Sequence, residues 1–536
     1  MERELQKSVA RNASTLVSGR LSASVISFIG TILLVRGLGA SDYGALNVAW
    51  ALPFILSLVA DLGLSGASIY FVARGTAQEQ KGFVGNSVRT ALRAVGATGI
   101  VFSIAVYLMA DSVTFLLLSD MQYAPVFRIA ALGIFASSLF NVTLSVLLGF
   151  EKMRAASASI IMQTLVRSIG APVAVYIGLG VSGAMACFVI ASFASALLNL
   201  ISIAGTMRSV VGSSEIGVRP EDGHSLLGQM VSYGFPVSLS SMLLNSMVPA
   251  VNLVLPVFAT LGEIGEFNVV ATYATVLWVV SAPFADTLFP LFSKLDPEKD
   301  SVTLKRMFHD TASQVAIFMT PAIFIIAAVP LFAVQSLFGA GHDLAVEYLP
   351  IYLMSFVGTA LGSLAIGGLL KGQGVPSRET GMSILNIVVV FSLGALWAPL
   401  MGIFAFLFSF VAGGLVGLLA GQIWVRRRFD LMLPKKILGI ILCGLTAYLV
   451  APQIVRLLPQ MHWVVEGILI IALSTAVYVL MLALTRTVSP SFLEQLRDSY
   501  RGTGILYVPV LVMVRILLPI ARRTTTQTKR AQQQSP

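Results

Sequence analysis

The chain has 536 residues, of which 56% are hydrophobic and only 11% are charged, and its mean hydropathy is +0.87. Soluble domains carry about 25% charged residues, so this chain has too little polar surface to fold as a water-soluble globule. Its formal net charge of +10 comes mainly from basic residues in short segments between apolar runs, where such residues orient a membrane protein. This distribution argues against a nucleic-acid-binding protein.

Apolar runs long enough to cross a bilayer recur along the chain, since a membrane-spanning helix needs about 20 residues. They predict an all-α, polytopic membrane protein with about 14 transmembrane helices. In chain order the predicted spans are 14–35, 44–66, 88–110, 124–148, 155–178, 182–205, 230–256, 267–291, 312–334, 345–370, 380–399, 401–424, 436–456 and 463–485.

Basic residues lie almost entirely on one side of these spans. With the N-terminus inside, the inside segments through Lys436 hold 22 Lys and Arg, whereas the outside segments through Arg456 hold only Arg36 and Arg456. Because Lys and Arg accumulate in cytoplasmic loops, we expect a cytoplasmic N-terminus.

The C-terminal segment 487–536 has a different pattern. Residues 490–500 show apolar positions at helical spacing, and 505–520 is apolar but short and contains Arg515. A fifteenth span over 505–520 would place four basic residues outside, so the pattern favours a cytoplasmic interfacial helix followed by a disordered basic tail. The spanning alternative stays open.

Three landmarks recur at nearly one offset, which indicates an internal repeat. The segment Gly44-Ala-Leu-Asn-Val48 is matched by Gly265-Glu-Phe-Asn-Val269, 221 residues later. Two further glycine pairs lie at the same points of a six-helix unit, with offsets of 223 and 222; they are Gly149 with Gly372 and Gly180 with Gly402.

Six spans per unit make the two copies parallel. The predicted domains are an N-lobe over 1–206 with spans 1–6 and a C-lobe over 227–425 with spans 7–12. The two additional spans follow at 436–486, and the interfacial segment and tail at 487–536.

Five short segments carry a resemblance to a known superfamily. Over residues 10–425, their order and spacing resemble the multidrug/oligosaccharidyl-lipid/polysaccharide exporter superfamily, and most of all its oligosaccharide (O-antigen and polysaccharide biosynthesis) flippases. The segments are Gly37-Leu-Gly-Ala-Ser-Asp-Tyr-Gly44, Asp61-Leu-Gly-Leu-Ser-Gly66, Tyr233-Gly-Phe-Pro236, Leu288-Phe-Pro290 and Pro399-Leu-Met-Gly402.

The resemblance implies two six-helix lobes that open alternately to either side of the membrane. It implies a cargo of lipid-linked oligosaccharide on a polyprenyl or dolichyl phosphate or pyrophosphate, whose headgroup crosses through a cavity while its lipid tail stays in the bilayer. The implied setting is the cytoplasmic membrane of a prokaryote. We expect a monomer without cofactor or metal, with H⁺ or Na⁺ as a candidate coupling ion.

Charged side chains inside spans indicate a functional or structural role, because inserting each into the membrane costs about 2.5–3.5 kcal/mol. Arg20 lies in the first span, Arg93 near the inner end of the third, Arg128 near the outer end of the fourth, and Arg167 in the middle of the fifth. Because the planar guanidinium suits phosphate, we predict that these residues line the headgroup cavity. The alternatives are snorkelling for Arg93 and Arg128 and structural pairing for Arg20 and Arg167.

Two acids also lie within or near spans. Asp61 and Asp286 are candidates for a coupling proton or for an ion pair with an arginine, and Asp61 has a structural helix-end role as its alternative. We expect the repeat-related Asn47 and Asn268 to form hydrogen bonds between helices rather than to bind cargo.

Three other functions are alternatives to a flippase. The drug exporters of the superfamily often carry an acid in span 1, which is absent here, and the stretch 21–29 lacks the charges of lipid II flippases. A cation-coupled multidrug or metabolite antiporter is the main alternative. A membrane glycosyltransferase or polymerase is disfavoured, because the longest loops contain no catalytic or metal-binding motif, so we expect no enzyme. A non-transporting scaffold is the third possibility.

Overall fold

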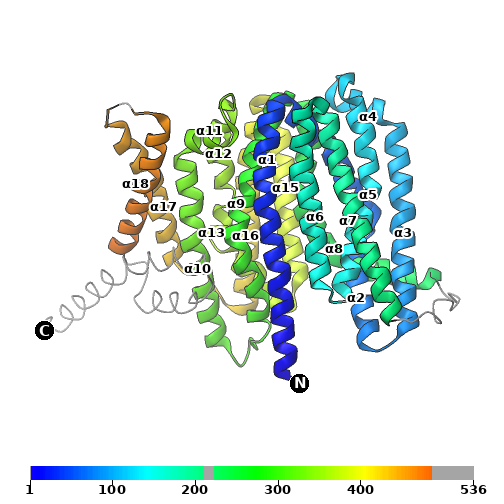
Figure 1. The fold of residues 1–536 in the computed structure, drawn as a ribbon. Coiled ribbons are helices and arrows are strands. Elements are labelled where there is room, and N and C mark those ends of the chain that lie inside the picture. Colours follow the sequence, from blue (N-terminus) through cyan, green and yellow to red (C-terminus); the bar gives the residue numbers. More distant parts are fainter. Residues whose placement is uncertain (1, 211–222, 460, 486–536) are drawn as a thin grey trace. The chain divides into compact units, whose positions relative to one another are not determined.

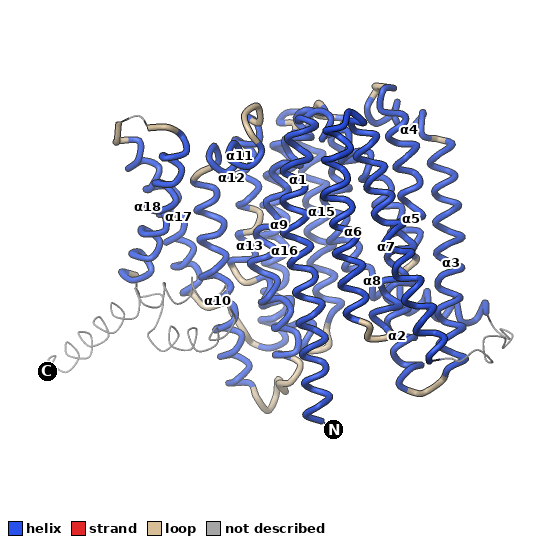
Figure 2. The backbone as a smooth tube through the Cα atoms, viewed as in Figure 1, coloured by secondary structure: helices blue, strands red, loops and turns tan. Residues whose placement is uncertain are grey.

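The computed structural model describes residues 2–210, 223–459 and 461–485. Within these residues every regular element is helical, and Figure 2 shows helices joined by short loops with no strand. This confirms the prediction of an all-α, polytopic membrane protein. The predicted interfacial helix, the run 505–520 and the basic tail lie outside the described residues.

The helices follow one another in chain order (Figure 1). The first nine are α1 (Glu2–Asp61), α2 (Leu64–Ala77), α3 (Lys81–Leu108), α4 (Ala110–Leu118), α5 (Ala124–Gly149), α6 (Met153–Ala174), α7 (Gly180–Val210), α8 (Gly223–Val254) and α9 (Leu261–Phe292). The next nine are α10 (Ser301–Ala328), α11 (Pro330–Phe338), α12 (Asp343–Met354), α13 (Val357–Ala360), α14 (Ser363–Gly372), α15 (Pro376–Met401), α16 (Ile403–Phe429), α17 (Lys436–Arg456) and α18 (Trp463–Leu484).

Ten continuous helical segments of the described chain are long and apolar enough to cross a membrane, or eleven with the bent pair Asp343–Ala360 and Ser363–Gly372. Two of the ten, Gly19–Asp61 with 43 residues and Met153–Arg208 with 56, each contain two predicted spans. The predicted span 230–256 lies mostly in α8. Each of the fourteen predicted spans therefore falls largely on helices of the structure.

Glycines mark the breaks inside these two long segments. Gly39 has φ 76 and ψ 174 within α1, and Gly178 and Gly180 have φ 90 and φ 56 between α6 and α7. A residue with a Cβ rarely adopts such left-handed angles, so the chain can turn here without a separate loop. The turns lie where the sequence predicts the ends of spans 1 and 5.

The chain divides into two compact units. The first contains 1–275, 338–345 and 383–409, and the second contains 276–337, 346–382 and 410–536. In the first unit α5 packs against α7, and α1 and α7 pack against α6; in the second α10, α17 and α18 pack together. The division into lobes at 1–206 and 227–425 stays a prediction.

Repeat-related residues form equivalent contacts within the first unit. The Asn47 amide donates to the carbonyl of Tyr43 and the Asn268 amide to that of Ile264, each at 2.8 Å. Both ends of these bonds are related by the 221-residue offset. Asn268 also exchanges amide hydrogen bonds with Asn252 of α8, at 2.9 and 3.0 Å.

The repeated glycines lie against the opposite copy. A methyl group at Gly44 would collide with the carbonyl oxygen of Leu261, and one at Gly265 with that of Ala40. Ala40 and Leu261 are themselves 221 residues apart, so the contact is reciprocal, as across a twofold axis. This symmetry supports the duplication and explains why both positions are glycine.

Candidate functional site

Arg167 lies near the middle of α6, against two aromatic rings. Its guanidinium carbon is 3.7 Å from the ring centroid of Phe188 on α7 and 5.6 Å from that of Trp50 on α1. The two rings meet edge to face with centroids 5.4 Å apart. The Arg167 side chain is exposed rather than enclosed by protein, and a cation–π contact is worth about 0.5–2 kcal/mol, so the rings offset part of the cost of placing a charge in the membrane.

The donors of Arg167 are not used within the described part of the chain. None of the ion pairs there includes Arg167, and no hydrogen bond from its guanidinium is formed. The guanidinium carbon lies over both rings, whereas its five N–H donors lie in the plane of the group. Arg167 is therefore held in place and still able to bind an anion.

A cavity of about 220 Å³ adjoins Arg167. Its lining combines one cation, four aromatic rings and seven neutral polar side chains, drawn from α1, α5, α6 and α7. These residues are Ser27, Trp50, Phe54, Ser57, Ser137, Phe140, Asn141, Gln163, Thr164, Arg167, Phe188 and Ser192. Small-molecule sites typically enclose about 300–1,000 Å³, so this cavity fits one phosphate or sugar unit rather than a whole oligosaccharide.

The polar lining is only partly satisfied by the protein. The Gln163 amide donates to the Ser192 hydroxyl at 3.3 Å, which links α6 to α7. Ser27, Ser137 and Asn141 form no hydrogen bond with other described residues. Polar groups at a cavity in an apolar protein need partners, and here a hydroxylated or anionic ligand can supply them.

Arg167 was predicted from the sequence, whereas the other residues of this lining were not. The missed residues recur at spacings of three or four along each helix, which places them on one face. That spacing of polar and aromatic positions inside apolar spans was the available signal. Together with Arg167, the lining positions at this spacing on each helix are 50, 54 and 57 on α1; 137, 140 and 141 on α5; 163, 164 and 167 on α6; and 188 and 192 on α7.

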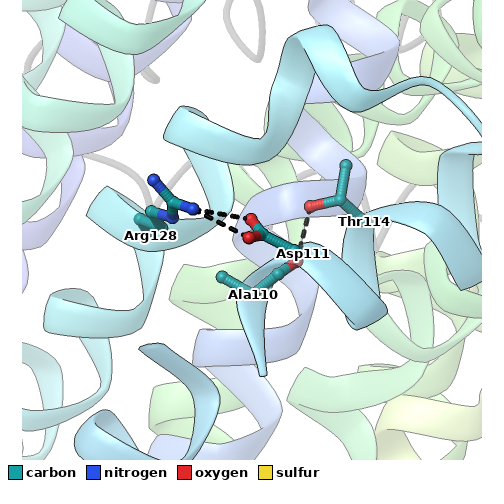
Figure 3. A network of polar contacts seen from close by, with 4 residues as sticks. All are labelled: Ala110, Asp111, Thr114 and Arg128. Atoms are coloured by element: carbon teal, nitrogen blue, oxygen red, sulfur yellow. Dashed lines mark hydrogen bonds and ion pairs between the residues drawn. The ribbon is translucent and has the colours of Figure 1, made fainter. Parts of the chain in front are cut away.

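Arg128 has a local partner. Figure 3 shows its guanidinium on α5 facing Asp111 on α4, with one nitrogen 2.8 and 3.0 Å from the two carboxylate oxygens. Both side chains are about half exposed, at 48% and 52%. An exposed pair of this kind contributes little, about 0–1 kcal/mol, but it ties α4 to α5 and engages Arg128 outside the cavity.

Arg20 and Arg93 are exposed side chains on α1 and α3. Neither is among the residues that line the cavity at Arg167. The carbonyl of Arg20 accepts a hydrogen bond from the Ser24 hydroxyl at 3.0 Å, and its guanidinium forms none in the described chain. The structure thus does not bring the four predicted arginines together.

Asp61 is a helix-end residue. It is 6% exposed, and its carboxylate accepts hydrogen bonds from the Ser65 hydroxyl at 2.6 Å and from the Ser65 amide at 3.2 Å. Leu62 and Gly63 turn the chain between α1 and α2 with φ 51 and 77, and Asp61 satisfies an otherwise unpaired amide at the start of α2. Asp286 belongs to α9, and its side chain lies outside what the structure describes.

A buried pair that the sequence did not reveal joins α9 to the start of α12. His342 Nδ1 lies 2.9 Å from one Glu266 oxygen, and the Ala345 amide donates to the other at 3.1 Å. Both side chains are nearly inaccessible, at 6% and 5%. Among the described residues no group of three or more His, Cys, Asp or Glu could hold a metal ion.

Comparison with solved structures identifies the fold. A multidrug resistance MATE family transporter of the MOP superfamily, in an inward-facing conformation, superposes with a TM-score of 0.66 at 18% identity, covering 76% of this chain and 94% of that one. The lipid II flippase MurJ, in an inward closed conformation, gives a TM-score of 0.64 at 11% identity and covers 88% and 98%. At these identities the likeness establishes the transporter fold.

Comparison with sequences identifies the family. No curated protein sequence matches the chain significantly. A family profile described as polysaccharide biosynthesis protein matches residues 9–296, more than half of the chain and including every residue that lines the Arg167 cavity. The chain therefore belongs to the polysaccharide biosynthesis protein family.

Proposed function

We propose that this protein is a flippase that moves a lipid-linked oligosaccharide across the cytoplasmic membrane by alternating access, for surface polysaccharide or glycan biosynthesis. The observation that carries the proposal is Arg167, a cation with free donors beside a polar and aromatic cavity. The cargo is carried on a polyprenyl or dolichyl phosphate or pyrophosphate, and Arg167 binds that phosphate.

The sign and the lining of the cavity support this cargo. Its residues include one cation and no acid, so an anionic headgroup is attracted and a cationic drug is repelled. The planar fork of arginine pairs with two phosphate oxygens at once. The unpaired hydroxyls and the Asn141 amide suit a sugar, and the aromatic rings provide apolar surface for its less polar faces.

The remaining parts of the proposal follow from charge and topology. The excess of basic residues on one side favours a cytoplasmic N-terminus, and a duplicated chain can form the pathway as a monomer. If transport is coupled to H⁺ or Na⁺, Asp286 is the candidate acid, because the Asp61 carboxylate is engaged by Ser65.

The second candidate is a cation-coupled multidrug or metabolite antiporter, which the fold likeness to a MATE transporter supports. It requires an acidic site for a cationic substrate, whereas the described cavity is basic. The two functions therefore differ in which class of compound accumulates when the protein is removed.

Depletion of the protein followed by mass spectrometry of the lipid extract tests the proposal. Build-up of one lipid-linked oligosaccharide, with loss of the matching surface glycan, is the expected result, and re-expression of the wild-type chain should reverse it. An unchanged lipid profile with greater sensitivity to cationic drugs would favour the antiporter. Accumulation of a shorter or unpolymerised glycan already on the outer face would favour a membrane enzyme.

A further inference from the structure

The second unit contains a basic pocket that the proposed function does not use. This basic pocket has a volume of about 370 Å³ and lies where α14, α15 and the last turn of α16 meet. Three arginines line it, Arg378 from α15 and Arg427 and Arg428 from α16, and Trp424 lies among them. Leu370 and other apolar side chains complete the wall.

Trp424 packs against α15. The guanidinium of Arg378 lies over the indole at 5.4 Å from the ring centroid. A methyl group at Gly381 would come within 2.8 Å of Trp424 Cη2, so the indole packs directly on the backbone of α15. The pocket therefore has an aromatic wall that is built into the α15–α16 contact.

The charge of the pocket is not neutralised by the protein. The acid nearest in sequence, Glu379, pairs with Lys371 at 2.9 Å, and none of the three lining arginines forms an ion pair in the described chain. Asp430 follows the cluster and is exposed. Segments 371–379 and 426–430 together hold five basic and two acidic residues.

Topology alone accounts for basic residues at this helix end, because cytoplasmic loops collect Lys and Arg and cations are favourable in the last turn of a helix. It does not account for a cavity in which three guanidiniums, an indole and an apolar wall converge. Basic pockets between helices at the cytoplasmic face are typical sites for anionic lipid headgroups, and tryptophan favours the same interfacial depth.

We propose that the basic pocket binds the phosphate of an anionic glycerophospholipid of the cytoplasmic leaflet as a resident lipid, separate from the cargo. Arg427 and Arg428 hold the phosphate oxygens, Arg378 and Trp424 close one side, and the acyl chains follow the apolar wall at Leu370. The volume lies within the range of about 300–1,000 Å³ typical of small-molecule sites. The same phosphate chemistry would also suit a free phosphate ion, which the experiment must separate from the lipid.

The test is native mass spectrometry of the full chain in detergent with either phosphatidylglycerol or phosphatidylcholine. The double variant Arg427→Gln/Arg428→Gln should weaken phosphatidylglycerol binding by about 25-fold, since each arginine near a membrane surface contributes about fivefold. Arg426→Gln is the matched control for the single variants Arg427→Gln and Arg428→Gln, each expected to lose about fivefold, because it removes one charge from the same turn but does not line the pocket. It should change binding by less than about twofold.

Equal losses in the control and in the single variants would overturn the proposal, since the arginines would then act only as general charge. Equal binding of the two lipids, or displacement of phosphatidylglycerol by millimolar inorganic phosphate, would overturn the lipid as ligand. If the double variant fails to fold, Arg378→Gln tests the same pocket from α15, with an expected loss of about fivefold.

Discussion

The Arg167 cavity of the first unit and the basic pocket of the second unit share one local construction. In each, a guanidinium lies near a tryptophan, and that indole packs on a glycine of a neighbouring helix. A methyl group at Gly133 would lie 2.9 Å from Trp50 Cζ3, and one at Gly381 would lie 2.8 Å from Trp424 Cη2. The two sites differ in depth, since Arg167 lies near the middle of its helix whereas Arg427 and Arg428 lie at the end of theirs.

The difference shows how membrane depth sets the number of charges that one motif can carry. A cation near the middle of a span is expensive, so a single arginine is present there, and its guanidinium carbon lies over two aromatic rings. At a helix end the cost falls, and three arginines line one pocket, where Arg378 lies over the indole of Trp424. The first arrangement suits the selection of a passing anion, and the second suits the retention of a resident one.

Replacing Arg167 is expected to have the largest effect. Arg167→Gln should lower the transport of lipid-linked oligosaccharide in proteoliposomes by about 10- to 100-fold, because a hydrogen bond to a charged group is worth about 1.5–3 kcal/mol. Arg167→Lys should recover part of this loss, because it restores the charge but not the planar fork.

Arg93→Gln and Arg20→Gln are the charge-matched controls for this experiment, as both side chains are exposed and lie outside the cavity lining. A correctly inserted Arg167→Gln protein that transports normally would remove the basis of the proposed function. A large loss in Arg20→Gln would instead extend the headgroup path to Arg20, as the sequence predicts.

The glycines beneath the two tryptophans should differ in their tolerance of a methyl group. Gly133→Ala should lower the free energy of unfolding by about 1–3 kcal/mol, as overpacking does, because Trp50 contacts both Phe188 and Arg167 and any shift of its indole also displaces these groups. Gly381→Ala should cost less than about 1 kcal/mol, since Trp424 can shift into the basic pocket. Thermal unfolding of the purified variants in detergent measures both, and equal losses would contradict the difference in confinement.

Much of the fold was predictable because it depends on hydrophobicity along the chain. The apolar runs predict the helices, and the 221-residue repeat agrees with the reciprocal packing of Gly44 and Gly265. The sequence divides each of the two longest segments into two spans near the observed turns, but the form of the turns was not predictable, since Gly39 and Gly178 turn the chain without a polar loop. Their positive φ angles depend on how the flanking helices pack.

The site was predictable only in part. Arg167 and Arg20 look alike in the sequence, each a single charge in an apolar run, yet only Arg167 lines the cavity. Sequence position indicates how deep a side chain lies but not which neighbouring helix it faces. The Glu266–His342 pair was hidden for a related reason, because its members are 76 residues apart and meet only through packing of the first unit.

Removing the aromatic partner of each arginine should destabilise the protein by no more than crowding Trp50 does. Phe188→Leu nearly conserves volume and should cost about 1–2 kcal/mol of unfolding free energy, the value of a cation–π contact near the middle of a span, where little water competes for the charge. Trp424→Leu should cost about 0.5–1 kcal/mol, because its partner Arg378 lies near a helix end, where water competes for the charge. If Trp424→Leu proves the more destabilising change in thermal unfolding, the first unit does not depend on these rings to hold a charge in the membrane.

The smallest expected effect is a difference between the two sites in their response to salt. Raising the ionic strength from about 0.1 M to about 1 M shortens the Debye length from about 10 Å to about 3 Å. The basic pocket at the helix end should then retain phosphatidylglycerol several-fold less well, whereas transport through the Arg167 cavity should change by less than about twofold, since charges away from bulk water near the middle of a span are screened less. Lipid retention by native mass spectrometry and transport in proteoliposomes measure the two responses on one preparation. If both fall together, the Arg167 donors are as open to solvent as those of Arg427 and Arg428, and the contrast between a selective deep cation and a retentive shallow cluster fails.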